Sequence, residues 1–250
     1  MGKKGFRGGT PTWDLSFISI FRSIKLLLIP FIVYSLGMLP SIAFLLYSFR
    51  FFNFFQAWNW IFLPFFLIFS FFLFIVFETL IPGIFIRILP LKIDEGEHEI
   101  SIKNKNFYRY SLYFILYRPA LKIVTFLPLI PLRTMFYRIV GLKFGKNTLF
   151  AGSELIHDPP TIEIGDNTLI GGWSQITGHI GERKLYVKKV KIGNNCLIGG
   201  KSIIFPGVII EDDVTVALGS VVPKNKILKK GKIYGGVPVK VIGSNLKNKK

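Results

Sequence analysis

The sequence has few of the residues that crosslink a chain, bind metals or carry negative charge. Its 250 residues include one cysteine, three histidines and 14 Asp plus Glu. The single cysteine, Cys196, excludes an intramolecular disulfide framework. His, Cys and carboxylate residues form no cluster at the spacing of metal ligands, so no metal is expected. A nucleotide-phosphate loop is also missing, because Gly199-Gly200-Lys201 lies inside a repeat.

Basic and apolar residues are in excess instead. Lys and Arg number 32, which gives a formal net charge of +18, and half of all residues are hydrophobic, including 26 Phe. Such a charge indicates an anionic partner, either nucleic acid or lipid headgroups. Because the apolar residues form long runs in the first half of the chain, membrane lipids are the expected partner and nucleic acid is not.

Two of these runs predict a pair of transmembrane helices over 24–86. Residues 26–49 contain no charge, and a helix of this length, at about 1.5 Å per residue, exceeds a hydrocarbon core of about 30 Å. Residues 57–77 form a second uncharged run, which continues as an apolar stretch to Ile86. A buried hairpin of a soluble protein would need a larger surrounding domain, so two membrane spans are expected.

Basic residues flank the two runs unequally. The N-terminal tail, 1–23, and the segments next to the spans are rich in Lys and Arg, and the C-terminal tail, 245–250, is basic. The flanking residues are Lys3, Lys4, Arg7, Arg22 and Lys25 before the first run, Arg50 between the runs, and Arg87, Lys92, Lys103, Lys105 and Arg109 after the second. Because cytoplasmic flanks carry the excess of Lys and Arg, both termini and the C-terminal half are expected on the cytoplasmic side of the cytoplasmic membrane.

Residues 87–143 predict a polar connector followed by interfacial helices. Alternating charged residues around Glu97 and Glu99 indicate a short strand, and His98 between them is expected to be solvated. Prolines divide 111–140 into pieces too short to span a bilayer, and its basic residues suit anionic headgroups. The alternative is that these helices pack as a cap against the domain that follows, and both arrangements are compatible with the sequence.

From Phe144 onward the sequence repeats every six residues. An aliphatic or aromatic residue heads each hexad, the fifth place of most hexads is small, and Gly often follows the head. The clearest heads are Ile164, Ile170, Ile176, Ile192, Ile198, Ile204, Ile210, Val216 and Val222. This period is typical of a solenoid of very short parallel strands with three strands per coil. The fold expected is therefore an α+β membrane protein whose residues 144–244 form a parallel β-helix of about four coils, 144–161, 164–181, 192–209 and 210–227.

Two interruptions of the period stand out. Extra residues around His157-Asp158-Pro159-Pro160 break the first coil and predict a turn. The ten residues Glu182 to Lys191 separate the second and third coils and predict a loop outside the helix, where functional residues often lie.

His179 is the strongest catalytic candidate. It closes the second coil, at an outward place of its hexad, immediately before the expelled loop. An imidazole titrates near neutral pH and can accept a proton from an attacking hydroxyl or amine. Glu182, three residues later, could orient the imidazole or bind an amine acceptor. The alternative for Glu182 is a solvated loop residue beside Arg183 and Lys184.

Residues 144–243 resemble the left-handed β-helix acyltransferases of the hexapeptide-repeat superfamily. The resemblance is carried, in order, by Thr177-Gly178-His179, Val190 to Asn195, Ile204 to Val208, Gly219 to Val222 and Tyr234 to Ile242. It implies a left-handed coil, acyl transfer with His179 as general base, and an acyl-CoA co-substrate, with acetyl-CoA as one option. It also implies a homotrimer with active sites between adjacent prisms.

The resemblance further implies a cofactor groove beside the last coils. The positions that correspond to the groove are Gly200, Leu218, Gly219, Lys224 and Lys240. Small residues suit a slender pantetheine arm, and a Lys side chain suits phosphate. Three departures weaken the acetyl-CoA and sugar assignments more than acyl transfer itself. Leu218 replaces a usual Ala, Pro223 replaces a Thr, and Ala151 stands where sugar-acetylating members often carry Asn.

With the membrane half included, the chain also resembles the C-terminal membrane regions of poly-lysine-type nonribosomal peptide synthetases. This second resemblance is carried by Arg138 to Gly145 and by Gly178-His179-Ile180-Gly181-Glu182. It implies that a carrier-protein thioester could replace acyl-CoA as donor, and the basic surface would suit an acidic carrier. The sequence therefore predicts a membrane-anchored acyltransferase with a small-molecule, sugar, lipid or amino-acid acceptor. The alternative is a non-catalytic trimeric membrane scaffold; His179 at the motif position favours the enzyme, and the changes at Leu218 and Pro223 leave the scaffold open.

Overall fold

The computed structural model describes residues 16–50, 56, 60–127 and 129–245. They divide into two compact units. The repeat unit contains 16–20, 92–110 and 141–245, and the helical unit contains 21–91 and 111–140, within the described ranges. Helix α3 begins in the repeat unit and continues in the helical unit.

Four α-helices are present in the described residues. They are α1 (Phe17–Arg50), α2 (Leu63–Ile88), α3 (Lys105–Phe126) and α4 (Ile130–Ile139). The first two are long and apolar enough to cross a membrane by length and composition, and most of their large apolar side chains are exposed in the isolated chain. The prediction of two long apolar helices is confirmed. The predicted start of the second, at 57–59, lies outside the described residues.

Small and polar residues lie at the contacts within the helical unit. Gly37 of α1 faces the Glu78 side chain of α2, where an added Cβ would lie 2.8 Å from the carboxyl carbon. The Ser70 hydroxyl of α2 donates to the Ser41 carbonyl of α1 at 3.1 Å. Helix α3 runs through Pro119 without ending, so the expectation that this proline divides the segment is wrong. Residues on both sides of the proline are buried, including Leu116 and Val124, and their packing keeps α3 one continuous helix.

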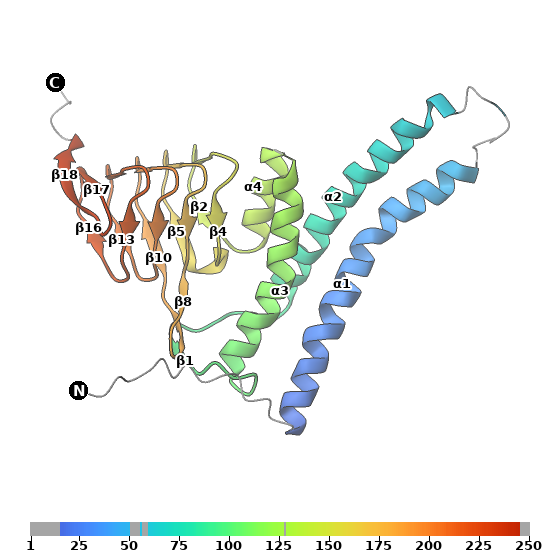
Figure 1. Ribbon diagram of the computed structural model, residues 1–250, viewed down its shortest axis with the longest axis horizontal. Helices are drawn as coiled ribbons and strands as arrows, with labels where there is room; N and C mark the ends of the chain where they lie inside the picture. Colours follow the sequence, from blue (N-terminus) through green and yellow to red (C-terminus); the bar gives the residue numbers. More distant parts are fainter. Residues whose placement is uncertain (1–15, 51–55, 57–59, 128, 246–250) are drawn as a thin grey trace. The chain divides into compact units, whose positions relative to one another are not determined.

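The repeat unit consists of short strands arranged in three parallel sheets (Figure 1). The first sheet contains β2 (Lys143–Phe144), β5 (Ile162–Ile164), β10 (Val190–Ile192), β13 (Ile209–Ile210) and β16 (Ile227–Leu228). The second contains β3 (Leu149–Phe150), β6 (Leu169–Ile170), β11 (Leu197–Ile198), β14 (Thr215–Val216), β17 (Lys232–Gly235) and the antiparallel β18 (Lys240–Ser244). The third contains β4 (Leu155–Ile156), β7 (Gln175–Ile176), β12 (Ile203–Ile204) and β15 (Val221–Val222). The predicted parallel solenoid is confirmed, and β16 to β18 add part of a fifth coil after four complete ones.

The six-residue period determines which side chains enter the core. Hexad heads from Ile156 to Leu228 are at most 5% exposed, and the small-place residues Thr168, Cys196 and Ser202 are at most 3% exposed. Pairing in register stacks identical places of successive coils, as Ile170 lies beside Ile198. The bends after the first sheet use Asn or Asp at positive φ, because these residues tolerate the left-handed region better than most. They are Asn147, Asn167, Asn195 and Asp213.

The long break in the period forms a β-hairpin. Strands β8 (His179–Gly181) and β9 (Leu185–Val187) pair antiparallel, and β1 (Gly96–His98) adds to β9 as a third strand. The expelled segment therefore begins at His179, earlier than the predicted start at Glu182, and His179 opens the hairpin rather than closing the second coil. The short strand expected near Glu97 is present, and its partner is the hairpin.

Candidate active site

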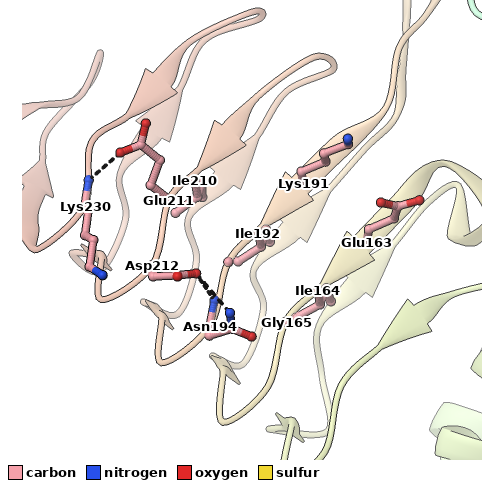
Figure 2. Close-up of a pocket in the computed structure, with 11 residues that line it drawn as sticks. Glu163, Ile164, Gly165, Lys191, Ile192, Asn194, Ile210, Glu211, Asp212 and Lys230 are labelled. Atoms are coloured by element: carbon pink, nitrogen blue, oxygen red, sulfur yellow. Dashed lines mark hydrogen bonds between the residues drawn. The ribbon is translucent and has the colours of Figure 1, made fainter.

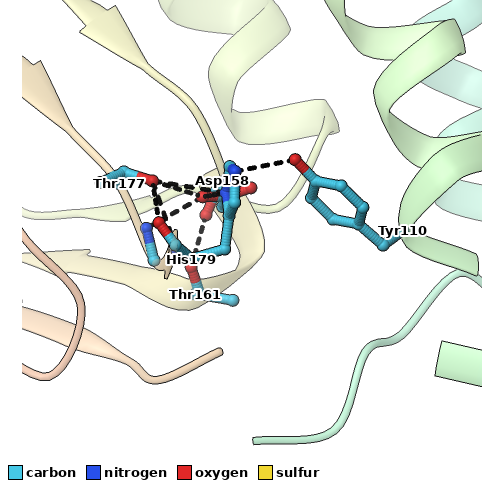
Figure 3. Close-up of polar contacts among 6 residues, drawn as sticks. Tyr110, Asp158, Thr161, Thr177 and His179 are labelled. Atoms are coloured by element: carbon cyan, nitrogen blue, oxygen red, sulfur yellow. Dashed lines mark hydrogen bonds and ion pairs between the residues drawn. The ribbon is translucent and has the colours of Figure 1, made fainter. Parts of the chain in front are cut away.

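His179 and Asp158 form a close polar pair in the repeat unit. The His179 Nδ1 atom lies 2.6 Å from Asp158 Oδ2 (Figure 3), and the two side chains are 19% and 6% exposed. A carboxylate can only accept a hydrogen bond, so Nδ1 carries a proton, and in the neutral imidazole Nε2 then keeps its lone pair. The pair therefore presents an oriented imidazole whose Nε2 can act as a base.

The Asp158 carboxylate is itself held by the next coil. Its Oδ2 atom accepts a hydrogen bond from the Gly178 N–H at 2.9 Å, and the Thr177 hydroxyl lies 3.2 Å away. The Asp158 carbonyl accepts from Thr161 N at 2.9 Å and from Thr161 Oγ1 at 2.8 Å. A side chain at Gly178 would collide with Thr161 Oγ1, so only Gly leaves room for this arrangement. Asp158 is thereby fixed before any substrate binds.

Sequence reasoning missed Asp158, although a signal was present. The extra residues at His157-Asp158-Pro159-Pro160 form a 3₁₀ turn over Pro159–Thr161. Strand β4 ends at Ile156, and its partner β7 ends at Ile176. Asp158 and Gly178 each lie two residues after the end of their strand, so they occupy equivalent positions in successive coils. An interruption one coil before the catalytic candidate was therefore the sign of a second residue of the site.

Tyr110 contacts the other nitrogen of the imidazole. Its hydroxyl lies 2.8 Å from His179 Nε2, and the two ring centroids are 4.8 Å apart with the rings tilted by 56° (Figure 3). Since Nδ1 carries the proton, the Tyr110 hydroxyl donates to Nε2. Tyr110, His179 and Asp158 therefore form one series of hydrogen bonds that sequence reasoning did not anticipate.

The start of α3 holds Tyr110 in place. The Asn104 side chain accepts from the N–H groups of Asn106 and Phe107, at 2.9 and 3.1 Å, and so caps the helix. Asn106 Nδ2 lies 3.3 Å from His98 Nδ1, and His98 Nε2 lies 2.7 Å from the Asp94 carbonyl. His98 is 9% exposed, so the expectation of a solvated histidine is wrong. Because β1 ends at His98 and pairs with the hairpin, the start of α3 and the strand of His179 belong to one connected framework.

Glu182 makes a different contact from the one predicted by its spacing. Its carboxylate lies 2.7 Å from Lys224 Nζ, and the side chains are 53% and 46% exposed. The hydrogen bond to Glu182 raises the pKa of Lys224. Next to it, the side-chain amide oxygen of Asn225, Oδ1, accepts from the Tyr186 hydroxyl at 3.1 Å and from Lys188 Nζ at 2.8 Å. Lys224 and Asn225 therefore tie the hairpin to the coils, and the carboxylate that orients His179 is that of Asp158.

The predicted groove residues fall in three places. Gly200 and Gly219 lie at the same corner of successive coils, where the Gly219 N–H donates to the Gly200 carbonyl at 2.9 Å. A Cβ on Gly200 would lie 3.3 Å from Leu218, whose side chain is 74% exposed. Lys240 begins β18 and is exposed. The structure thus brings Gly200, Leu218 and Gly219 together, and it places Lys224 at the hairpin.

A shallow groove of about 530 Å³ runs along the first sheet (Figure 2). Several of its polar groups are paired with one another. Asn194 donates to Asp212 Oδ1 from its backbone at 2.7 Å, and the Lys230 N–H donates to Glu211 at 2.9 Å. A hydrogen bond from Lys229 lowers the pKa of Glu211. The lining contains no histidine and none of the predicted site residues, so this groove does not hold the chemistry assigned to His179.

Comparison with known proteins gives similarities that concentrate on the repeat. The family model for the hexapeptide repeat of succinyl-transferase matches residues 189–224. YvoF of Bacillus subtilis, whose name gives it as a proposed acetyltransferase, is 34% identical over 129 residues, 49% of this chain and 73% of YvoF. Galactoside O-acetyltransferase of Escherichia coli is 34% identical over 110 residues, 41% of this chain and 53% of that protein.

Two further similarities have lower sequence identity. Delta-poly-L-ornithine synthetase of Acinetobacter baumannii is 29% identical over 115 residues, which are 41% of this chain and 8% of the synthetase. Among solved structures, a hexapeptide-repeat-containing acetyltransferase from Vibrio cholerae is 26% identical with a TM-score of 0.40. The alignment covers 42% of this chain and 64% of that one.

Proposed function

Because the chain belongs to the hexapeptide-repeat acyltransferase family, we propose that it moves an acyl group from a thioester to a hydroxyl or amine acceptor with His179 as general base. The observation that carries the proposal is the 2.6 Å contact between His179 Nδ1 and Asp158. It leaves Nε2 as the basic atom on a side chain that is partly exposed and opens the hairpin.

The proposed reaction needs one proton to move twice. Nε2 of His179 takes the proton of the attacking hydroxyl or amine as it bonds to the thioester carbonyl carbon. The imidazolium formed in this way is stabilised by the buried Asp158 carboxylate. When the carbon–sulfur bond breaks, the imidazolium returns the proton to the departing thiolate. The products are the acylated acceptor and a free thiol.

Acyl-CoA is the proposed donor, with acetyl-CoA first among the thioesters to test. The exposed corner formed by Gly200, Leu218 and Gly219 offers a narrow surface with few side chains, and Lys240 offers an exposed cation for phosphate. Galactoside O-acetyltransferase acts on a sugar, which makes a sugar hydroxyl the first acceptor to test. A carrier-protein thioester is the second donor, supported by the likeness to the synthetase over 8% of its length.

We also propose that α1 and α2 span the cytoplasmic membrane and hold a left-handed β-helix on its cytoplasmic side. The length and composition of the two helices support the spans. A homotrimer is supported by a row of outward leucines on the second sheet, Leu149, Leu169 and Leu197, which pair in register and are 61%, 38% and 41% exposed. An apolar row of this kind is typically buried against another chain.

The proposal predicts that His179→Asn loses about 10²–10⁴-fold in the rate of acyl transfer, because Asn retains size and some hydrogen bonding but is not a base. The measurement is thiol release from acetyl-CoA and other thioesters against a panel of sugars, lipids and amines. Lys240→Ala is the matched control, which should weaken donor binding and leave the rate of the bound complex largely intact. Parental turnover by His179→Asn would overturn the base assignment, whereas the absence of transfer by the parent across the panel would favour the scaffold.

A further inference from the structure

The basic atom of His179 already has a partner within this chain. Tyr110 donates to Nε2 at 2.8 Å, and Asp158 accepts from Nδ1 at 2.6 Å, so both ring nitrogens are occupied. The Tyr110 ring also lies against the imidazole, with the two ring centroids 4.8 Å apart (Figure 3). Direct acyl transfer needs Nε2 to face the hydroxyl or amine of the acceptor. The acceptor and the Tyr110 hydroxyl therefore compete for one position.

We propose that Tyr110 makes His179 selective for an acceptor over water, because its hydroxyl covers Nε2 until an acceptor displaces it. This inference rests on the proposed function, since it uses His179 as the base and a thioester as the donor. An uncovered base beside a thioester also takes a proton from water. The water oxygen then bonds to the carbonyl carbon, the carbon–sulfur bond breaks, and the thiolate receives the proton. A carboxylic acid and a free thiol result, and the acyl group is lost.

The selectivity comes from contacts that an acceptor makes and water cannot. An exchange at Nε2 replaces one hydrogen-bond donor with another, so the number of hydrogen bonds does not change. Tyr110 is held by its ring against the imidazole as well as by its hydroxyl, whereas a water molecule brings no further contact. A sugar or an amine binds through several groups, and that additional binding free energy drives the displacement of the tyrosine.

The backbone under Tyr110 is fixed, so the displacement needs the movement of only one side chain. Asn104 caps the start of α3, and the Arg109 side chain donates to the Lys92 carbonyl at 3.1 Å. An aromatic side chain on a helix has two common χ1 positions, and a change between them takes the hydroxyl away from Nε2. The fixed first turns of α3 also return the side chain to the same place once the product has left.

The first test measures access to Nε2 without any substrate. Diethyl pyrocarbonate modifies a neutral imidazole, and peptide mass spectrometry of the full chain in detergent gives the rate at His179, at mildly alkaline pH where an ordinary imidazole is neutral. Tyr110→Phe removes only the hydroxyl, and we expect it to accelerate labelling about tenfold, the effect of one lost hydrogen bond. Tyr110→Ala, which also removes the ring, should be labelled at least as fast.

Tyr108→Phe removes a hydroxyl from the same helix and should be labelled as the parent is. Equal labelling of His179 in the parent, Tyr110→Phe and Tyr110→Ala would show that Nε2 is not covered, and the proposal would be wrong.

The second test measures the loss of acyl groups to water in the absence of an acceptor. The reagent is p-nitrophenyl acetate, an activated ester that needs no thioester groove, and acetyl-CoA is assayed in parallel. We expect Tyr110→Phe to hydrolyse the ester about tenfold faster than the parent, and this gain should vanish when His179→Asn is added to the same chain. Hydrolysis at the parental rate would overturn the proposal, and so would a gain that persists without His179.

Transfer to an acceptor separates this inference from the proposed function. If the parent and Tyr110→Phe transfer the acyl group, His179→Asn does not, and hydrolysis is the same in the parent and Tyr110→Phe, the base assignment stands and the selectivity assigned to Tyr110 is wrong. If His179→Asn transfers at the parental rate, the base assignment fails and the selectivity fails with it, even where labelling shows that Nε2 is covered.

Discussion

At the scale of single residues, the site is built from three side chains that are far apart in sequence. His179 was accessible to sequence reasoning because it is an imidazole at the edge of a strict repeat. Asp158 and Tyr110 were not, because their roles depend on a turn made by two extra residues and on a helix that begins near a distant strand. Glu182 was predicted from its three-residue spacing, yet the hairpin turn directs it to Lys224 at 2.7 Å.

Asp158→Asn tests how much of the activity depends on the orientation and charge of this partner. The amide of this variant can donate a hydrogen bond to Nδ1, which favours the tautomer with its proton on Nε2 and so removes the base. The neutral amide also cannot stabilise an imidazolium. We expect kcat to fall about 10²–10⁴-fold with a small change in KM. Steady-state kinetics would measure this change, with Asp213→Asn as control, because Asn tolerates the φ of 59° at that bend. Unchanged kcat would show that His179 works without the carboxylate.

At the scale of elements, the sequence predicted what is periodic and missed what depends on distant pairing. The parallel strands followed from hexad heads that recur locally, and those from Phe150 to Leu228 are buried. The three-stranded sheet of β1, β8 and β9 joins residues 96–98 to 179–187, a pairing that no local pattern reveals. Pro119 was read as a helix end, although the packing of α3 on both sides of it maintains the helix.

The hairpin should be the element whose loosening most affects His179, since β8 begins at that residue. Asn225 accepts from Tyr186 and Lys188, and its φ of 61° suits Gly, so Asn225→Gly removes the two contacts without straining the backbone. We expect amide hydrogen exchange over 179–187 to accelerate about tenfold, with the coils unchanged. Glu182→Gln, which alters only an exposed ion pair, is the control and should show a smaller effect. Equal exchange in Asn225→Gly and the parent would mean that other contacts hold the hairpin.

At the scale of the whole molecule, the outward leucine row on the second sheet determines the last prediction. Leu169 is the central member, paired in register with Leu149 on one side and Leu197 on the other. If this row is buried between prisms, Leu169→Glu places an unpaired carboxylate in the interface, which is costly, while the inward Ile170 keeps the coil folded. We expect cross-linking and native mass spectrometry in detergent to show trimers for the parent and monomers for Leu169→Glu, with acyl transfer lost if the active sites lie between prisms.

Ile209→Glu makes the same change on the first sheet, where the side chain is 40% exposed, and should remain trimeric. Intact, active trimers of Leu169→Glu would place the subunit contact on another face.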